Sequence, residues 1–173
     1  PNFKWDWKVF REEKKKLKID YPPEHVIDKK IVLKNLEKHK SDSYVMWLDH
    51  ASFIIKLGNT TIITDPVFEK NYGPMVFGPK KYIESPLTLK ELPKIDLFLL
   101  THNHYDHMSI RTIKNFPYKN TKVLVPLKLG KYFTKNGYKK DTVKEMDWFD
   151  KIKINDEITV TMLPSQHWSK RWI

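Results

Sequence analysis

The chain has 173 residues, of which 40% are hydrophobic and none is cysteine, and its formal net charge is +11. This is one domain's worth of chain, with enough apolar residues for a substantial core. The lack of cysteine excludes disulfide frameworks and cysteine-ligated zinc sites. No apolar stretch approaches the roughly 20 residues of a transmembrane helix. The first residue is Pro1 rather than Met, which leaves room for an upstream targeting segment, so the compartment stays open.

The positive charge predicts attraction to phosphate-bearing partners such as an anionic membrane surface, a phosphodiester substrate or a nucleic acid. Lys and Arg number 32 against 21 Asp and Glu, and the densest run is Lys14, Lys15, Lys16 and Lys18. A platform for base stacking requires aromatic residues interleaved with the basic ones. Few aromatic residues are interleaved with these lysines. We therefore interpret most of the charge as a solvated lysine-rich surface, which disfavours nucleic acid and leaves an anionic membrane as a partner.

Residues 1–43 are predicted to be a basic and aromatic arm. The arm opens with an aromatic cluster formed by Phe3, Trp5, Trp7 and Phe10. Its periodicity predicts at most one short helix there and a second around Asp28 to Lys38. We expect the arm to wrap the core. The alternative is that the aromatic cluster dips into a membrane interface, where Trp is well accommodated.

Residues 44–173 are predicted to form the second part, in which strand and helix patterns alternate as in an α/β layer architecture. The predicted strands are Tyr44–Leu48, Ala51–Leu57, Thr60–Thr64, Ile95–Leu100 and Lys122–Pro126, followed by a hairpin over Ile152–Leu163 that turns at Asn155-Asp156. The predicted helices are Ser109–Phe116 and Leu127–Asn136. Phe68–Pro93, rich in Gly and Pro, is predicted to be a long loop that reaches over the site.

The segment Thr101–His107 reads T-H-N-H-Y-D-H and directly follows a predicted strand. Imidazole nitrogen and carboxylate oxygen are common ligands of zinc and neighbouring transition metals. Residues two apart in extended backbone point the same way, so His102 and His104 can bind one ion. Asp106 and His107 follow where the chain turns and can reach a second ion. The alternative is a solvated histidine-rich loop, but functional loops often leave a buried strand in this way.

The H-x-H-x-D-H motif resembles the signature of the metallo-β-lactamase superfamily, and further motifs resemble its N-acylphosphatidylethanolamine-hydrolysing phospholipase D branch. In chain order these motifs are W-L-D-H-A from Trp47, T-D-P from Thr64, G-P-K-K-Y from Gly78, S-P-L-T from Ser85, E-L-P-K-I-D from Glu91 and P-S-Q-H-W-S-K-R from Pro164. The resemblance spans about residues 44–172. It departs at Asp49, where the branch has Gly, and a turn that needs positive φ tolerates Asp less well.

The resemblance implies an αββα sandwich of which this chain supplies about the N-terminal half. It also implies two divalent metal ions, which we expect to be Zn²⁺. It implies that His167 is the third imidazole of the first metal site, beside His102 and His104. Asp106 and His107 then hold the second ion, with Asp106 also orienting the nucleophile. The implied accessory residues are Asp65 and His50, which orient ligands by hydrogen bonds, and Trp168, Lys170 and Arg171, which bind substrate.

The implied activity is hydrolysis of the phosphodiester of N-acylphosphatidylethanolamine or a similar phospholipid by metal-activated water. Alternatives within the superfamily are a sugar-phosphate lactonase and an RNA-processing nuclease, and an alternative outside enzymes is a catalytically silent metal-binding or membrane-binding module. The second ion has too few ligands in this chain. We therefore expect a C-terminal half of the same fold, from the same gene or a separate chain, to supply a bridging Asp and a further His.

Overall fold

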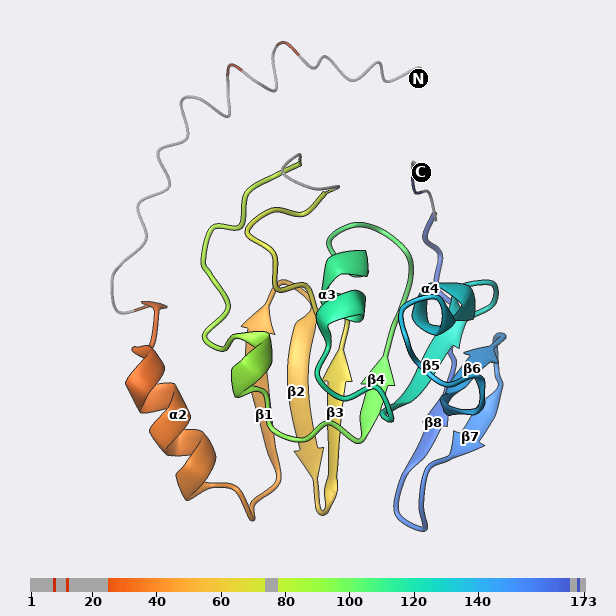
Figure 1. Cartoon of the computed structure of the whole chain (residues 1–173), viewed down its shortest axis with the longest axis horizontal. Coiled ribbons are helices and arrows are strands. Elements are labelled where there is room, and N and C mark those ends of the chain that lie inside the picture. The colour runs from red at the N-terminus through yellow and green to blue at the C-terminus, as the bar shows by residue number, and fades with distance from the viewer. Residues whose placement is uncertain (1–7, 9–11, 13–24, 74–77, 169–170, 172–173) are drawn as a thin grey trace.

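The computed structural model describes residues 8, 12, 25–73, 78–168 and 171. Its centre is a six-stranded sheet in the order β1-β2-β3-β4-β5-β6 (Figure 1). The strands are β1 Tyr44–Asp49, β2 Ser52–Leu57, β3 Thr60–Thr64, β4 Leu97–Leu99, β5 Lys122–Pro126 and β6 Val143–Met146. A separate hairpin consists of β7 Lys151–Lys153 and β8 Thr159–Thr161. The helices are α2 Lys29–Lys38, α3 Ile110–Asn115 and α4 Gly130–Thr134, with 3₁₀ turns η2 Leu89–Glu91 and η3 Lys140–Thr142.

The sheet topology brings several strand ends to one edge. β1, β2 and β3 form an antiparallel meander, whereas β3, β4, β5 and β6 pair in parallel. The carboxyl ends of β1, β3, β4 and β5 therefore lie along the same edge (Figure 1). Open α/β sheets commonly bind ligands at this edge. Here it collects His50, Asp65 and the loop that follows β4.

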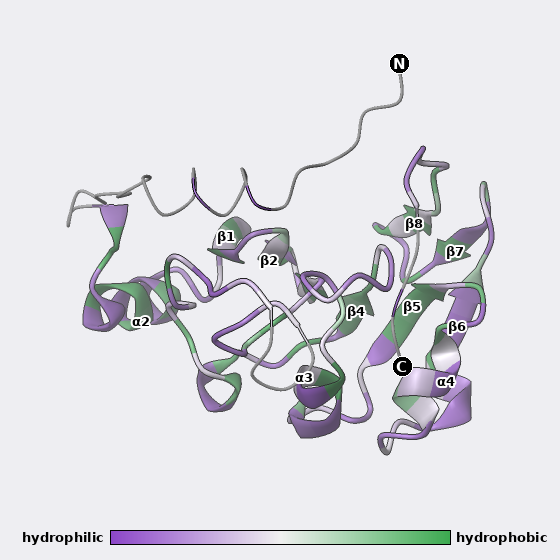
Figure 2. Cartoon of the chain, turned by 90° about the horizontal axis from the view of Figure 1, so that it is seen from above, coloured by the Kyte–Doolittle hydropathy of each residue, from purple (hydrophilic) through white to green (hydrophobic). Residues whose placement is uncertain are grey.

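The main core lies between one face of the sheet and helices α3 and α4. Phe98 on β4 is 1% exposed and packs edge-to-face on Phe116 and Phe133, with ring centroids 5.3 Å and 5.1 Å away. Ser109 caps α3 by accepting a hydrogen bond from the Thr112 backbone N–H. Figure 2 shows hydrophobic residues along the strands and hydrophilic residues on the outer side of α3. Burial of this apolar face fixes β4, and with it the start of the loop that follows.

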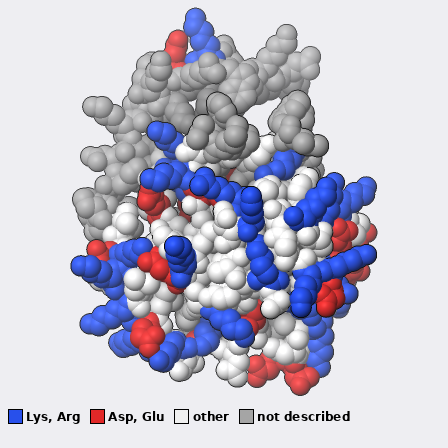
Figure 3. All heavy atoms as spheres, in the orientation of Figure 1, with Lys and Arg blue, Asp and Glu red and all other residues white. Residues whose placement is uncertain are grey.

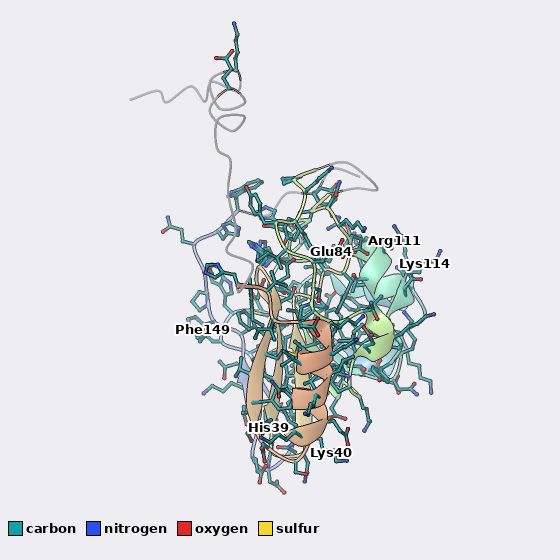
Figure 4. All side chains as sticks on the ribbon, turned by 90° about the vertical axis from the view of Figure 1, so that its left-hand side faces the viewer. His39, Lys40, Glu84, Arg111, Lys114 and Phe149 are labelled. Atoms are coloured by element: carbon teal, nitrogen blue, oxygen red, sulfur yellow. The ribbon has the colours of Figure 1, made fainter. Side chains whose placement is uncertain are left out.

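The opposite face of the sheet is covered only in part among the described residues. The β7–β8 hairpin packs on a smaller cluster formed by Ile62, Leu97, Leu124 and Met146. Toward the other edge of the sheet, Val45 and Trp47 of β1 are 67% and 51% exposed. Phe149 is 66% exposed, and Figure 4 shows it on the side of the sheet opposite Arg111 and Lys114 of α3.

Helix α2 lies beside the β1 edge (Figure 1). Asp28 caps it by accepting a hydrogen bond from the Lys30 backbone N–H at 2.8 Å. Val32 and Leu36 pack against the main core, so this part of the predicted arm contacts the sheet. The aromatic cluster and its predicted short helix lie outside the described residues. Within the described part of the chain, no helix combines the length and hydropathy that crossing a bilayer requires.

The mixed α/β architecture predicted from the sequence is confirmed, and most predicted strands lie within a residue or two of those observed. Helix α4 is shorter than the predicted Leu127–Asn136, because Lys128 adopts a positive φ of 67° and the helix begins only at Gly130. Strand β6 was not predicted. Its residues pair with β5 at the margin of the sheet, and two of its four side chains, Lys144 and Glu145, are exposed.

Candidate metal centre

Three imidazoles meet at the sheet edge, from segments far apart in the sequence. His102 Nε2 lies 3.0 Å from His104 Nδ1, and His167 Nε2 lies 3.2 Å from the same atom. His104 Nε2 is buried and has no hydrogen-bond partner among the described residues. Protons cannot bridge all these nitrogen atoms at once, whereas one cation can accept a lone pair from each ring. The three-histidine set therefore fits a zinc-like ion with a position left for water.

A second group of donors lies next to the first. His50 Nε2 is 3.0 Å from Asp106 Oδ2, and His107 Nε2 is 3.7 Å from the same oxygen. The ring centroids of His102 and His107 are 4.0 Å apart, so the two groups are neighbours. Donor atoms of His50, Asp106 and His107 all lie within 4.8 Å of one another. Two imidazoles and a carboxylate suit a divalent transition metal.

Asp65 contacts both groups from the end of β3. Its side chain is buried, and its carboxylate accepts hydrogen bonds from the Thr101 backbone N–H at 2.7 Å and from the Thr101 hydroxyl at 2.5 Å. His107 Nδ1 lies 2.8 Å from the same carboxylate, which leaves Nε2 facing Asp106. Thr101 Oγ1 is also 2.9 Å from His102 Nδ1. Such contacts fix the tautomer and orientation of a metal-binding imidazole.

The backbone is strained at the two residues that directly follow β1 and β3. His50 has φ of 43° and Asp65 has φ of 39°. Side chains disfavour this left-handed region, and such outliers cluster at functional sites because surrounding contacts hold them. The His50 carbonyl accepts a hydrogen bond from Trp47 Nε1 at 3.0 Å. The Asp65 backbone N–H donates to the Leu99 carbonyl at 3.0 Å. From the sequence, a positive φ was a concern at Asp49, where the branch has Gly. In the structure the positive φ falls on the next residue, His50.

The surroundings of the histidines shift their pKa values in different directions. Burial, followed by the charges of His107 and His104, lowers the pKa of His102 to about 4. Burial and then the charge of His167 likewise lower the pKa of His104. Burial also lowers the pKa of His107, but the hydrogen bond and charge of Asp65 and the charge of Asp106 outweigh it, so this pKa is raised. His102 and His104 are therefore neutral near pH 7, which is the form that binds metal.

The predicted substrate-binding residues take different positions. The Trp168 ring lies 4.2 Å from the His104 ring and is 65% exposed, so it forms part of the rim of the first group. Arg171 donates from Nη1 to the carbonyls of Asn103 and Met108, at 3.0 Å and 2.7 Å, and so braces the metal loop. Lys170 lies outside the described residues.

Sequence reasoning missed two residues near His50. Tyr72 donates its hydroxyl hydrogen to the Asp49 carboxylate, and its ring lies 5.4 Å from the His50 ring. Lys81 Nζ lies 2.6 Å from Asp49 Oδ2. Both residues come from the long loop predicted to reach the site. The departure at Asp49 was the available signal, because an acidic residue in place of Gly needs partners when it is buried.

A mostly apolar cavity of about 770 Å³ borders the first group of histidines. His102 and His167 line one end of it. Apolar side chains of β4, β5 and β8 and of the segments around them line the rest, including Leu99, Leu124, Val160 and Met162. The volume is in the range of ligand-binding pockets, which bury apolar groups and orient them with a few polar atoms.

Residues 60–173 match the β-lactamase superfamily domain family, over more than half of the chain. The chain belongs to this family. A relative in Caenorhabditis elegans, N-acyl-phosphatidylethanolamine-hydrolyzing phospholipase D 1, is 32% identical over 162 residues, which cover 83% of this chain and 46% of the relative. The predicted superfamily and its N-acylphosphatidylethanolamine phospholipase D-like branch are thereby confirmed, and this is a family of metal-dependent hydrolases.

Two solved structures show the same fold. A possible metal-dependent hydrolase from Veillonella parvula has a TM-score of 0.52 at 21% identity, covering 65% of this chain and 45% of that one. CmlA, a diiron β-hydroxylase from Streptomyces venezuelae, has a TM-score of 0.53 at 27% identity, covering 72% of this chain and 24% of that one. The chain spans about a third to a half of the length of curated relatives that it matches. It therefore corresponds to about half of a metallo-β-lactamase fold, as predicted.

Proposed function

We propose that this chain is part of a metal-dependent phosphodiesterase that hydrolyses N-acylphosphatidylethanolamine or a similar phospholipid. The observation that carries the proposal is the convergence of two groups of residues at one sheet edge. His102, His104 and His167 form the first group, and Asp106 and His107, with His50 beside them, form the second. The identity to the worm phospholipase D supports the substrate class.

The donor sets fit two divalent ions, and we propose zinc at both positions. Imidazole and carboxylate ligands also suit iron, which the Streptomyces venezuelae protein uses. When bound, two such ions lower the pKa of water and stabilise the charge of a phosphodiester. His102, His104 and His167 hold the first ion, while Asp106 and His107 contribute to the second.

The protein residues then supply orientation. We propose that Asp65 fixes the rings of His107 directly and of His102 through Thr101, by the hydrogen bonds described above. His50 orients the Asp106 carboxylate, which lies 3.0 Å from it. Asp106 positions the attacking water and accepts its proton, because its carboxylate lies beside His107 Nε2 at 3.7 Å and remains partly open to solvent.

The apolar cavity beside His102 and His167 supports a lipid substrate. Phosphate at the metal edge would place an acyl chain along β4, β5 and β8, where its burial stabilises the complex. The net charge of +11 favours anionic phospholipid at the membrane surface. Figure 3 shows Lys and Arg side chains spread over one face with Asp and Glu between them, so we propose general attraction rather than a single basic docking patch.

We also propose a partner for the partly covered sheet face. A C-terminal half of the same fold, from the same gene or a separate chain, would pack on the exposed Val45, Trp47 and Phe149. It would supply a bridging Asp and a further His to the metals. The match covers only 45% of the Veillonella parvula chain, which supports a fold that extends beyond the part matched here.

The test uses the complete protein, loaded with zinc and freed of excess metal. One preparation is assayed with N-acylphosphatidylethanolamine in mixed micelles, with a sugar-phosphate lactone and with RNA, and Asp106→Asn protein serves as the control. We expect phosphatidic acid and N-acylethanolamine from the lipid only. Turnover confined to the lactone or the RNA would replace the phospholipase proposal, and retained metal without turnover of any of them would favour a silent binding module.

A further inference from the structure

We propose that Asp49, Lys81 and Tyr72 form a clamp that positions His50, and through it Asp106, at the metal edge. We call these three residues the Asp49 clamp. The inference deepens the proposed metal-dependent hydrolase function, because it assigns positioning residues to the same site. They lie in two segments: Asp49 ends β1, whereas Tyr72 and Lys81 belong to the loop between β3 and β4.

A buried ion pair forms the centre of the clamp. Lys81 Nζ lies 2.6 Å from Asp49 Oδ2, and the two side chains are only 3% and 11% exposed. Lys81 Nζ also donates a hydrogen bond to the Val67 carbonyl, which ties both ends of the loop segment together. A buried charge is costly unless it is paired and hydrogen-bonded. The pair therefore fixes one arrangement of the loop against the end of β1.

Tyr72 transmits this arrangement to the metal edge. Its hydroxyl donates a hydrogen bond to Asp49, and Lys81 Nζ lies 5.3 Å from its ring centroid. Its ring also lies 5.4 Å from the His50 ring. The His107 ring lies 5.1 Å from His50 in an edge-on contact. His50 is thus held between Tyr72 and His107 while its Nε2 meets Asp106.

The place of the Asp49 clamp in the chain indicates that it positions His50 and does not merely attach the loop. Asp49 directly precedes His50, whose φ of 43° requires outside contacts to be maintained. The same loop carries a second ion pair, Lys70 with Glu84 at 3.2 Å, whose side chains are 86% and 74% exposed. An exposed pair of this kind contributes little. It provides a matched control, because it belongs to the same loop and touches none of the metal donors described here.

The experiment measures zinc binding and turnover in the complete protein carrying Tyr72→Phe, Lys81→Met or the control Lys70→Met. Tyr72→Phe keeps the ring and removes only the hydroxyl. We expect zinc affinity at the weaker of the two positions to fall by about 10-fold to 100-fold in the two clamp variants, the range for loss of residues that orient metal ligands. We expect kcat to fall by a similar factor with KM nearly unchanged, and Lys70→Met to match wild type in both.

A double variant separates the clamp from a simple loss of stability. Asp49→Asn/Lys81→Met removes both charges and keeps an oxygen that accepts the Tyr72 hydroxyl hydrogen. We expect it to recover zinc affinity and thermal unfolding temperature relative to Lys81→Met alone. Wild-type zinc affinity in both Tyr72→Phe and Lys81→Met, with only a lowered unfolding temperature, would overturn the inference. Zinc titration decides this even if the wild-type protein hydrolyses no phospholipid, so the two proposals fail separately.

Discussion

At the scale of single residues, the first group of histidines combines low basicity with close approach. The pKa of His102 is lowered to about 4, first by burial, and the Nε2 atoms of His102 and His167 lie 3.0 Å and 3.2 Å from His104 Nδ1. A solvated histidine-rich loop would leave each ring hydrogen-bonded to water. The observed arrangement instead presents several lone pairs to one point, which favours a bound cation.

The metal-ligand assignment predicts that His102→Ala and His104→Ala each abolish tight metal binding and hydrolysis in the complete protein. Removing one of three imidazoles leaves too few ligands for a stable tetrahedral site. Elemental analysis after dialysis measures the metal content. His39→Ala is the matched control, because His39 contacts Asp42 in an exposed pair away from the site. Full metal content in both site variants would show that the ligands lie elsewhere.

Asp106 gives a prediction about chemistry rather than folding. Asp106→Asn should leave the fold and the first metal position largely intact while kcat falls by at least ~10²-fold, since ligand charge and orientation of the nucleophile stabilise the transition state. Its side chain is 38% exposed, so the substitution empties no core space. Circular dichroism checks the fold and steady-state kinetics the rate. Wild-type turnover in this variant would remove Asp106 from the mechanism.

Much of the candidate site could be named from the sequence, because local spacing shows which donors leave one strand together. His102, His104, Asp106 and His107 are adjacent in the chain and are also adjacent in space. Tyr72 and Lys81 could not be found in this way. Their importance depends on a contact with Asp49 across the fold, and no local periodicity encodes such a contact.

At the scale of elements, the predictable strands are those with strong apolar patterns. β3 and β5 were predicted with the observed bounds, because Thr60–Thr64 and Lys122–Pro126 combine β-branched residues with clear turn signals. β6 lacks that pattern, because its charged residues face solvent and only Met146 is buried. Its pairing with β5 is a tertiary effect that overrides local propensity.

Helix α2 is joined to the turn η2 by a charged contact with a testable pH dependence. Lys29 Nζ lies 2.8 Å from Glu91 Oε1. The Lys29 hydrogen bond, followed by hydrogen bonds from Thr88, lowers the pKa of Glu91 from 4.5 to about 2. Because the folded-state pKa is depressed, the stabilisation is fully present above pH 4.5 and is lost as the pH falls toward 2.

We therefore expect Glu91→Gln to lower the free energy of unfolding near neutral pH by about 1 kcal/mol or less, since solvent screens this partly exposed pair. The difference from wild type should shrink on acidification through the range in which Glu91 titrates. Urea unfolding at several pH values measures it, with Glu84→Gln as the control in an exposed pair of the same loop. A difference that grows on acidification would contradict the assignment.

At the scale of the whole molecule, the two faces of the sheet are unequal. One face is covered by α3, α4 and η2, whereas on the other Val45, Trp47 and Phe149 each expose half or more of their surface. Exposed apolar patches of this kind mark interfaces or aggregation hazards. The exposed face is where we propose that a C-terminal half of the same fold packs.

The proposed partner predicts the behaviour of residues 1–173 expressed alone. We expect self-association or poor solubility, and fewer than two tightly bound metal ions per chain. Co-expression with the proposed C-terminal half should give a soluble complex with both ions bound. Analytical ultracentrifugation and elemental analysis measure these properties. A soluble, cooperatively folding monomer that binds two metals and turns over substrate would contradict the proposal.

The distance in sequence between the metal donors has a further consequence. His50, the loop of His102 and His104, and His167 come from well-separated parts of the chain and meet at one edge of the sheet. A metal ion bound there would link segments that are far apart in the sequence. A link that persists in the unfolded chain closes a long loop and reduces the conformational entropy of that chain. Because the site is assembled only in the folded state, metal binding and folding are thermodynamically coupled. Chelation would then loosen the segment after β8, where His167 belongs to the first group of donors, and the end of β1, where His50 belongs to the second.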